Sequence, residues 1–524
     1  MKNDLVTCRC RDYTIDGFGI AEYEGLVLFV KGLLLNEKAV VKIVSHKKNL
    51  AYAIVDQILE ASPYRTEPAC PVAYKCGSCD LQHMNYEGQL LFKKKLVENT
   101  FRQAHLDIQI AEVTGADEPW RYRDKIQIPV RDHLFGYYRR YSNDIVEQAD
   151  CLLHSEKENE IVAFLKEKLL ASGLDKQVRH LVLKEGYYSH EIMVCFVTKK
   201  DIAKELGAIT KELVREYPEI VSVLENIHPQ ENNVILAVGE QLLAGQDYIT
   251  DRIGELDFRI SLHSFYQINV RQTEKLYAKV RELADLKGTE NVLDLYCGIG
   301  TIGLSLTRNA GSLTGIEIVP EAIENAKQNA ELNGIKNASF YCSDAKENLS
   351  DYLKNKDLVI VDPPRKGLSA EVTNALLQSD VKQIIYVSCN PATLVRDLNI
   401  LKEQYDFDTA YPFDLFPQTT HVETVVQLSK GNISSQNIRV EFSLEDMDMS
   451  RFQQGATYEQ IQDWVQEKYG FHVTHLNIAQ VKRKHGIIER KNYNKPKSEG
   501  SRSPETPREK EKAIIEAFRH FGMI

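Results

Sequence analysis

The sequence predicts an α/β protein in four parts: an OB-like β-barrel, a central α+β domain, a doubly wound, mostly parallel sheet and a C-terminal helical extension. Three observations predict this order. Short β-rich runs open the chain, strands and helices alternate from residue 261, and charged helical sequence follows residue 430. We place the domains at residues 1–58, 59–260, 261–430 and 431–524, which suits a length of 524 residues.

The charge balance and the ends of the chain limit the possible classes of protein. The formal net charge of −10 argues against a surface coated in basic charge, but it leaves room for local basic patches. Residues 1–4 lack the apolar stretch of a signal peptide, and no apolar run is long enough to predict a membrane span. We therefore expect a cytoplasmic monomer without a membrane partner, whose ten cysteines form no disulfides.

The first part of the chain has the spacing of a small β-barrel. Its β-rich runs lie near residues 27–30 and 40–43, and glycine turns lie near residues 17–19 and 24–25. This pattern predicts a five-stranded OB-like barrel over residues 1–58.

The central part begins with an irregular, cysteine-bearing stretch over residues 59–85. Residues 88–104 then predict a lysine-bearing amphipathic helix, whose apolar face suits packing on the third domain. Short strands and helices alternate from residue 116 to residue 255, without a glycine-rich phosphate loop.

The third part alternates strands and helices in the manner of a parallel sheet. The predicted strands are residues 291–295, 313–318, 358–361, 384–387 and 424–428. The predicted helices include residues 273–286 and 320–333.

The last part predicts two helices over residues 457–469 and 474–485, a flexible linker over residues 492–511 and a short helix over residues 511–521. Basic residues 482–485 end the second helix. They indicate either a helix-turn-helix contact with RNA or a partner, or a solvated helix end, and both alternatives stay open.

A nucleoside site is predicted where the first strand of the parallel sheet runs into a glycine turn. Glu317 closes the next strand and can accept hydrogen bonds from ribose hydroxyls, while Asp344 ends the strand after it and can reach an adenine amino group. Gly298, Gly300 and Gly303 also satisfy the dinucleotide pattern G-x-G-x-x-G, so an NAD-linked oxidoreductase remains an alternative at this point.

We expect three further motifs at the carboxyl ends of the sheet strands, the edge where such sheets bind ligands. They are Asp362-Pro363-Pro364-Arg365, Ser388-Cys389-Asn390-Pro391 and His421-Val422-Glu423. Carbon-5 of uracil is a poor nucleophile, but thiolate addition at carbon-6 makes the ring an enolate whose carbon-5 can attack an electrophilic methyl group. A base must then remove the carbon-5 proton so that the thiol leaves.

Cys389 suits the nucleophile of this reaction and Glu423 suits the base. Because a free thiol is little ionised near neutral pH, we expect the protein to lower the pKa of Cys389. The alternatives are a buried structural cysteine at position 389, a surface acid at position 423 and an amino-methyltransferase loop at Asp362. An amino-methyltransferase needs no nucleophilic cysteine, and an NAD-linked oxidoreductase gives Cys389 and Glu423 no role.

Over about residues 1–430, these motifs resemble the RNA uracil-5-methyltransferase family of the tRNA and 23S rRNA type. The resemblance implies a Rossmann-like class I methyltransferase domain, with Cys389 as nucleophile and Glu423 as general base. It also implies a set of S-adenosylmethionine contacts: Gln267, Tyr296, Thr301, Glu317, Asp344 and Asp362. Relatives often have Asn where this chain has Thr301, so we expect a weaker or shifted contact there.

Four cysteines form a further candidate site: Cys70, Cys76, Cys79 and Cys151. Spacing alone allows either zinc or a [4Fe–4S] cluster. The pattern resembles the 23S rRNA branch of the family, which implies a [4Fe–4S] cluster with a structural or RNA-orienting role and 23S rRNA as the partner, before or during ribosome assembly.

RNA-binding segments are predicted in the first two domains. The barrel resembles a TRAM domain in residues 16–21 and 27–30, although residues 33–37 depart from its pattern. Residues 120–141 interleave cations with tyrosines, as readers of single-stranded RNA do, or form an ordinary hairpin. The cations are Arg121, Arg123, Lys125, Arg131, Arg139 and Arg140, and the tyrosines are Tyr122, Tyr137, Tyr138 and Tyr141.

These expectations together predict a 23S rRNA uracil-5-methyltransferase. A tRNA uracil-5-methyltransferase and a cluster-bearing RNA-binding scaffold without activity are the alternatives.

Overall fold

A computed structural model describes residues 2–230, 232–431, 458–484 and 506–520. Contacts divide the chain into two units, Met1–Asn432 and Ile433–Ile524, which are described separately below. Residues 492–505 of the predicted linker and His485 of the basic cluster lie outside the described residues.

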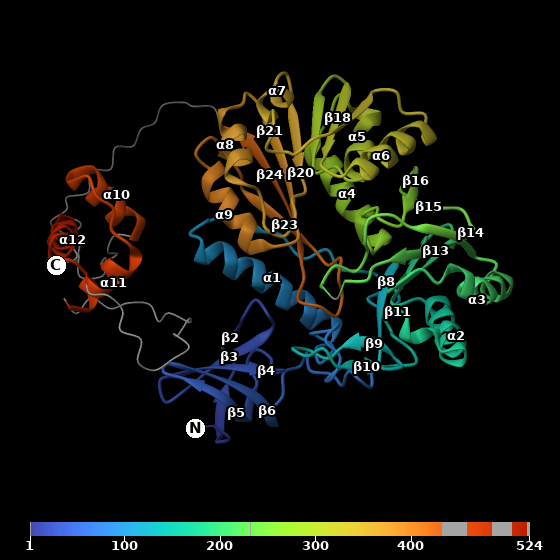
Figure 1. Cartoon of the computed structure of the whole chain (residues 1–524), viewed down its shortest axis with the longest axis horizontal. Helices are drawn as coiled ribbons and strands as arrows, with labels where there is room; N and C mark the ends of the chain where they lie inside the picture. Colours follow the sequence, from blue (N-terminus) through green and yellow to red (C-terminus); the bar gives the residue numbers. More distant parts are fainter. Residues whose placement is uncertain (1, 231, 432–457, 485–505, 521–524) are drawn as a thin grey trace. The chain divides into compact units, whose positions relative to one another are not determined.

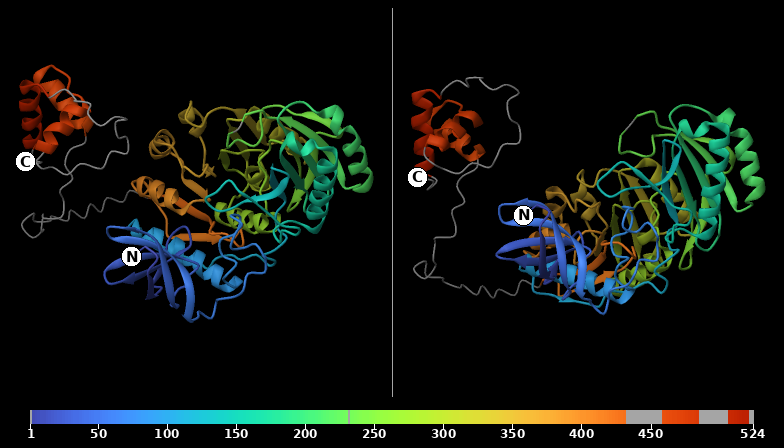
Figure 2. Two further views of the ribbon diagram at one scale, coloured as in Figure 1. Left: turned by 60° about the horizontal axis from the view of Figure 1, so that its bottom comes forward. Right: turned by 90° about the horizontal axis from the view of Figure 1, so that it is seen from below.

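The first unit begins with a curled six-stranded sheet, drawn in blue in Figure 2. Its strands are β1 (Leu5–Arg9), β2 (Asp12–Tyr13), β3 (Phe18–Tyr23), β4 (Leu26–Lys31), β5 (Lys38–Lys47) and β6 (Leu50–Glu60), in the order β1-β5-β6-β4-β3-β2. Strand β4 alternates buried Leu28 and Val30 with outward Phe29 and Lys31. This alternation fills the inside of a barrel-like fold and leaves aromatic and basic side chains outside.

The central sheet has seven strands in the order β10-β9-β8-β11-β12-β13-β14. They are β8 (Lys125–Arg131), β9 (Leu134–Tyr138), β10 (Ile145–Glu147), β11 (Val178–Glu185), β12 (Ile192–Thr198), β13 (Ile220–Ile227) and β14 (Gln241–Gly245). Helices α2 (Glu156–Ser172) and α3 (Ala203–Glu216) share one apolar core with it. The hairpin β15 (Tyr248–Ile253) and β16 (Leu256–Ser261) leads into the next domain.

The third sheet is doubly wound, with the order β19-β18-β17-β20-β21-β24-β23-β7 and with β22 paired to β24. Its strands are β7 (Gln109–Ile110), β17 (Asn291–Leu295), β18 (Ser312–Glu317), β19 (Ala338–Cys342), β20 (Leu358–Val361), β21 (Gln383–Ser388), β22 (Tyr405–Asp406), β23 (Thr409–Phe413) and β24 (Glu423–Lys430). Strands β17 to β21 run parallel, whereas β24 runs antiparallel to β21.

Helices cover both faces of this sheet (Figure 1). One face carries α4 (Val270–Ala284), α5 (Thr301–Leu306) and α6 (Pro320–Leu332), and the other carries α1 (Tyr86–Gln103), α7 (Leu349–Leu353), α8 (Ala370–Gln378) and α9 (Pro391–Leu401). Successive strand residues therefore enter different cores: Val292 joins the first and Leu293 the second. This arrangement confirms the predicted α/β class.

Helix α1 belongs to this third layer although it precedes the central sheet in sequence. It begins at Asn85, whose side chain accepts a hydrogen bond from the backbone of Gly88 at 2.9 Å. It packs on α9, and β7 then pairs with β23. Its buried residues include three with polar side chains, Gln89, Lys93 and Asn99, beside the apolar ones.

The second unit is described as three helices, α10 (Tyr458–Tyr469), α11 (His475–Lys484) and α12 (Arg508–His520). They enclose a core of their own, which includes Ile461, Val465, Ile478, Ile514 and Phe518. Across the described ranges of both units, no helix is long and apolar enough to cross a membrane.

Candidate active site and cysteine cluster

The register of the third sheet brings the predicted catalytic residues to one edge. Asp362 follows β20 and Cys389 follows the parallel strand β21, so both lie at carboxyl ends. Glu423 is the first residue of antiparallel β24, in which Thr424 pairs with Ser388. Antiparallel strands start where their neighbours end, so Glu423 and Cys389 meet at this edge.

Cys389 lies at the start of α9, in a turn that also fixes the Asp362 loop. Asn390 caps α9 by accepting the Ala392 N–H at 3.1 Å. The Asn390 amide also donates to the Arg365 carbonyl at 3.1 Å. The Cys389 side chain is half-buried, so the thiol is not sealed inside the protein.

The charges around Cys389 oppose its ionisation. Burial, and then the negative charges of Glu423 and Asp362, raise the pKa of Cys389 to about 11, while Arg365 lowers it. The expectation of a lowered thiol pKa was therefore wrong for the protein without RNA. Burial of the thiol is the main reason, and the charges of Glu423 and Asp362 add to it against the one guanidinium of Arg365.

The two carboxyl groups of the site are themselves shifted. Burial, and then the charge of Asp362, raise the pKa of Glu423 to about 8, while Arg365 and Lys93 lower it. Burial raises the pKa of Asp362 to about 7. Glu423 is only 5% exposed. A carboxylate that is shielded from solvent has a raised pKa and therefore binds a proton more strongly than an exposed one. This property suits a general base.

A buried ion pair beside Glu423 was not expected from the sequence. The Lys93 ammonium of α1 pairs with Asp414, which follows β23, and donates to the Phe416 carbonyl at 3.0 Å. The Tyr86 hydroxyl donates to the other Asp414 oxygen at 2.9 Å. The only signal in the sequence was a lysine on the apolar side of a predicted helix.

His421 contacts Arg365, the cation that also acts on Glu423. The Arg365 guanidinium donates to His421 Nδ1 at 2.8 Å. Burial, and then Arg365, lower the pKa of His421 to about 4, so its ring is neutral at pH 7. His421 is thus an uncharged neighbour of the carboxyl groups.

Tyr296 and Asp344 come after β17 and β19, and Glu317 is the last residue of β18, so all three lie along the same edge. Burial, and then the charge of Asp344, raise the pKa of Tyr296 to about 12, with Glu317 contributing. Glu317 accepts the Gly298 N–H at 3.3 Å. Gly298 has φ +55°, and a Cβ built on it would meet no atom within 4 Å, so open space adjoins the backbone there. This is the room a nucleoside needs.

Two predicted cofactor residues, Thr301 and Gln267, are not at the ends of the parallel strands. The Thr301 hydroxyl forms a 2.7 Å hydrogen bond with the Tyr277 hydroxyl at the start of α5. Gln267 is buried between β16 and α4, and in the described part of the chain no hydrogen bond joins its side chain to the strand-end residues.

The four predicted ligand cysteines lie close to one another. Burial raises the pKa of Cys79 to about 12, and the charges of Cys151, Cys76 and Cys70 add to this increase. Three of the thiols are buried and Cys79 is half-buried. Among the described residues, no group of three or more His, Cys, Asp or Glu side chains is arranged to hold a metal ion.

Arg123 is a buried cation beside these thiols. Burial opposes its charge, but the neighbouring Tyr122, Tyr137, Cys151 and Cys79 outweigh burial and raise the pKa of Arg123. The Nε atom is buried and has no hydrogen-bond partner within the described ranges. A buried donor without a partner needs an anionic or polar group that the protein alone does not supply here.

The four tyrosines of residues 120–141 differ in their exposure to solvent. Tyr122 is buried and donates to the Pro417 carbonyl at 3.0 Å, and the hydroxyl of half-buried Tyr137 lies 2.6 Å from His154 Nε2. Tyr138 and Tyr141 are exposed and line an open pocket of about 750 Å³ that also contains Thr420. Two of the four tyrosines thus take part in internal contacts, and the other two are exposed.

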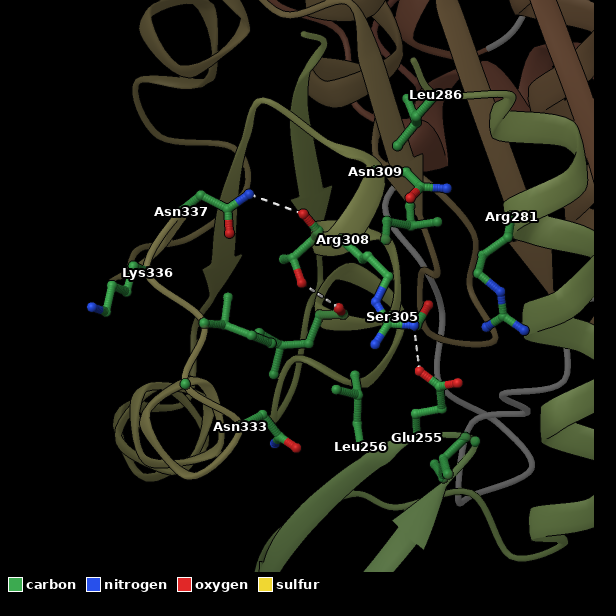
Figure 3. A pocket seen from close by; sticks show the side chains of 17 residues that line it. Glu255, Leu256, Arg281, Leu286, Ser305, Arg308, Asn309, Asn333, Lys336 and Asn337 are labelled. Carbon is green, nitrogen blue, oxygen red and sulfur yellow. Dashed lines mark hydrogen bonds and ion pairs between the residues drawn. The ribbon is translucent and has the colours of Figure 1, made fainter. Parts of the chain in front are cut away.

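Figure 3 shows a different pocket, of about 650 Å³, that includes Arg281, Arg308 and Lys336 in its lining. It adjoins residues just before β18 and β19, at the amino ends of the parallel strands. The carboxyl-end residues described above take no part in it.

Comparisons with known proteins agree with this geometry. The family described as tRNA (uracil-5-)-methyltransferase matches residues 85–431. A Bacillus cereus protein described as an uncharacterized RNA methyltransferase is 39% identical over 447 residues, covering 82% of this chain and 97% of that protein. A Staphylococcus aureus protein of the same description is 41% identical, covering 81% of this chain and 98% of that protein.

A solved structure is also similar over most of the chain. It is the Pyrococcus abyssi tRNA (uracil-54, C5)-methyltransferase in complex with S-adenosyl-L-homocysteine. The TM-score is 0.66 and the identity 28%, over 81% of this chain and 100% of that one.

Proposed function

The chain belongs to the RNA uracil-5-methyltransferase family, a family of S-adenosylmethionine-dependent enzymes, and from this we propose that it methylates carbon-5 of a uridine in 23S rRNA. In this proposal Cys389 is the nucleophile and Glu423 the general base. The observation that carries these two roles is the pairing of Ser388 with Thr424 in adjacent strands. This pairing brings Cys389 and Glu423 close to each other, and the charges of Glu423 and Asp362 both act on the thiol.

The proposed reaction uses the two side chains in sequence. The Cys389 thiolate forms a bond to carbon-6, and the ring electrons move onto carbon-5 and the carbonyl oxygen. Carbon-5 then takes an electrophilic methyl group, which S-adenosylmethionine supplies. The Glu423 carboxylate removes the carbon-5 proton, the electron pair of that bond restores the ring double bond, and the bond from carbon-6 to sulfur breaks.

The cofactor is proposed to lie along the edge formed by β17, β18 and β19. Glu317 is suited to the ribose hydroxyls and Asp344 to the adenine, with Tyr296 and the open space at Gly298 between them. Asp362, Thr301 and Gln267 complete the proposed set. The hydrogen bond between the hydroxyls of Thr301 and Tyr277 supports a weaker contact at position 301.

We include a [4Fe–4S] cluster at Cys70, Cys76, Cys79 and Cys151 in the proposal. The four thiols influence one another electrostatically, as neighbours do. Zinc and a cluster both suit four thiolates, and the resemblance to the rRNA branch is the reason for proposing the cluster. The unpartnered Nε of buried Arg123 fits an anionic cluster beside it.

The RNA is proposed to approach over the barrel and the outer residues of the 120–141 stretch. Phe18, Phe29 and Tyr52 form an aromatic group on the outer face of the N-terminal sheet, with ring centroids 6.2 and 5.6 Å apart. This suits the stacking of unpaired bases and supports a TRAM-like role for residues 1–58. The pocket at Tyr138 and Tyr141 also includes Thr420, which lies three residues before Glu423 in the chain.

Transfer RNA is the second candidate substrate, because the similar Pyrococcus abyssi structure is a tRNA enzyme. The four cysteines favour rRNA through their resemblance to the rRNA branch. Incubation of 23S rRNA and tRNA with labelled S-adenosylmethionine separates the two, with 5-methyluridine expected in the rRNA. 5-Methyluridine in tRNA alone would overturn the rRNA assignment.

Variants test the two catalytic roles. Cys389→Ala is expected to abolish transfer and to retain S-adenosylmethionine binding by calorimetry. Glu423→Gln is expected to accumulate a covalent protein–RNA adduct on denaturing gels, because carbon-5 keeps its proton. Normal turnover by Cys389→Ala would refute the nucleophile.

A further inference from the structure

We propose that Gln89 is a positioning residue for the proton abstraction step. It acts through Gln418 on the base loop, residues 414–422, and joins that loop to the cysteine loop, residues 70–84. The proposal rests on the assignment of Glu423 as general base. It assigns a kinetic role to a buried residue of helix α1 that is not among the proposed catalytic and cofactor-binding residues.

Gln89 uses both ends of its amide on the base loop. Its Nε2 donates to Gln418 Oε1 at 2.9 Å, and its Oε1 accepts the Gln418 N–H at 2.9 Å. The same Nε2 donates to the Met84 carbonyl of the cysteine loop at 3.1 Å. Gln89 is 1% exposed, so water does not compete for these bonds.

Gln418 has a backbone conformation that needs such support. Its φ is +70°, in the left-handed region that side chains other than glycine rarely adopt. Its carbonyl accepts the N–H groups of Asp80 and Leu81 at 2.8 and 3.0 Å. The turn at Gln418 is therefore held from one side by α1 and from the other by the cysteine loop.

The rest of the base loop is attached at further points on the way to Glu423. The Pro417 carbonyl accepts from Tyr122, and the Phe416 carbonyl accepts from Lys93. The Thr420 N–H donates to the Asp80 carboxylate at 3.4 Å. Because Glu423 begins the strand that this loop enters, the position of its carboxyl group depends on the turn at Gln418.

The proposal predicts which step fails when the attachment is lost. Thiol addition and methyl transfer use Cys389 and the cofactor edge. Within the described residues, no hydrogen bond joins Gln89 or Gln418 to either of them. Removal of the carbon-5 proton uses Glu423. A misplaced Glu423 therefore leaves the methylated ring bound to sulfur, whereas simple destabilisation lowers every step together.

The test compares Gln89→Met and Gln418→Asn with the wild type. Methionine keeps the size of Gln89 and removes its hydrogen bonds. Asparagine at position 418 tolerates the left-handed φ, but its side chain is too short to reach Gln89. Gln418→Asn therefore tests the proposal if Gln89→Met fails to fold. Gln103→Met, on the exposed end of the same helix, is the matched control.

Single-turnover reactions with rRNA and methyl-labelled S-adenosylmethionine are quenched and run on denaturing gels. The expected result is a kcat lower by about 10²-fold, an increase in labelled protein–RNA adduct, and an unchanged KM for S-adenosylmethionine. Deuterium at carbon-5 is expected to slow turnover more in the variants than in the wild type. Gln103→Met is expected to match the wild type.

Two results would overturn the proposal: wild-type turnover in both variants, or loss of adduct and turnover in equal proportion to the unfolded fraction. Glu423→Gln is run beside them. If it fails to trap an adduct, the base assignment itself is wrong, and the proposal falls with it. If it traps an adduct and the Gln89 and Gln418 variants do not, only the positioning role is refuted.

Discussion

At Cys389, three charged neighbours act on one sulfur atom. Glu423 and Asp362 raise the pKa of the thiol beyond the effect of burial, and Arg365 lowers it. The sequence places these residues in three separate motifs, so their strand-end positions were predictable from the β-α alternation. The balance of their charges was not, because it depends on how deeply each carboxyl group is buried.

The charges predict the pH dependence of methyl transfer. The thiolate of Cys389 gains population as pH rises toward about 11, and the carboxylate of Glu423 forms as pH rises through about 8. Both changes act in the same direction, so the single-turnover rate is expected to rise from about pH 6 to about pH 9. A flat or falling profile would contradict this account.

Arg365 supplies a matched pair of variants for the same point. Arg365→Met removes the charge that lowers the pKa of Cys389, so alkylation of Cys389 by iodoacetamide is expected to slow at a fixed pH. Arg365→Lys keeps the charge and is expected to retain most of the rate. Mass spectrometry of the Cys389 peptide measures both, and equal rates for the Met variant and the wild type would be inconsistent with the proposed charge effect.

At the scale of elements, helix α1 connects the catalytic edge to the cysteine loop. Its existence and approximate bounds followed from the sequence, as did β17 and β20, whose residues are apolar because both faces of the sheet are covered. The burial of Gln89 and Lys93 did not follow. Their partners Gln418 and Asp414 lie more than three hundred residues away in the chain, and local patterning carries no information about such pairs.

Lys93 tests the energetics of this connection. Lys93→Met leaves the Asp414 carboxylate buried without its cation, and the free energy of unfolding is expected to fall by about 3–5 kcal/mol. Lys94→Met on the same helix loses only a pair with exposed Glu112, and is expected to cost about 1 kcal/mol or less. Denaturant unfolding measures the free energy of unfolding of both variants. Equal losses would show that the buried ion pair stabilises the protein no more than the exposed one.

At the scale of the whole molecule, hydrogen bonds join the cysteine loop to the base loop, which leads into Glu423. The backbone of Asp80 and Leu81, next to Cys79, binds the Gln418 carbonyl directly. An iron–sulfur cluster bound by the four cysteines would thus fix the cysteine loop, and the cysteine loop in turn fixes the base loop.

Removal of the proposed iron–sulfur cluster is expected to reproduce the kinetics of the Gln89 variants. Protein stripped by a chelator and an oxidant is expected to bind S-adenosylmethionine normally, turn over slowly and accumulate the RNA adduct. Iron content and visible absorbance report the removal. Full turnover by stripped, folded protein would contradict a link between the cysteine loop and the base.

The second unit has a core of its own, and the family match ends before it, at residue 431. The third sheet is also complete at Lys430. A chain ending at Asn432 is therefore expected to transfer methyl groups to RNA at the rate of the full chain. Loss of S-adenosylmethionine-dependent transfer in a folded, truncated protein would assign the second unit a direct part in catalysis.

The most direct test of the account uses RNA in which the uridines carry fluorine at carbon-5. Glu423 has no proton to remove from such a ring, so the methylated intermediate stays bound to sulfur. Mass spectrometry of the digested complex is predicted to find one adduct, on the peptide of Cys389, carrying the methylated ring. An adduct on another residue, or none while the matching unmodified RNA is methylated, would contradict the central claim.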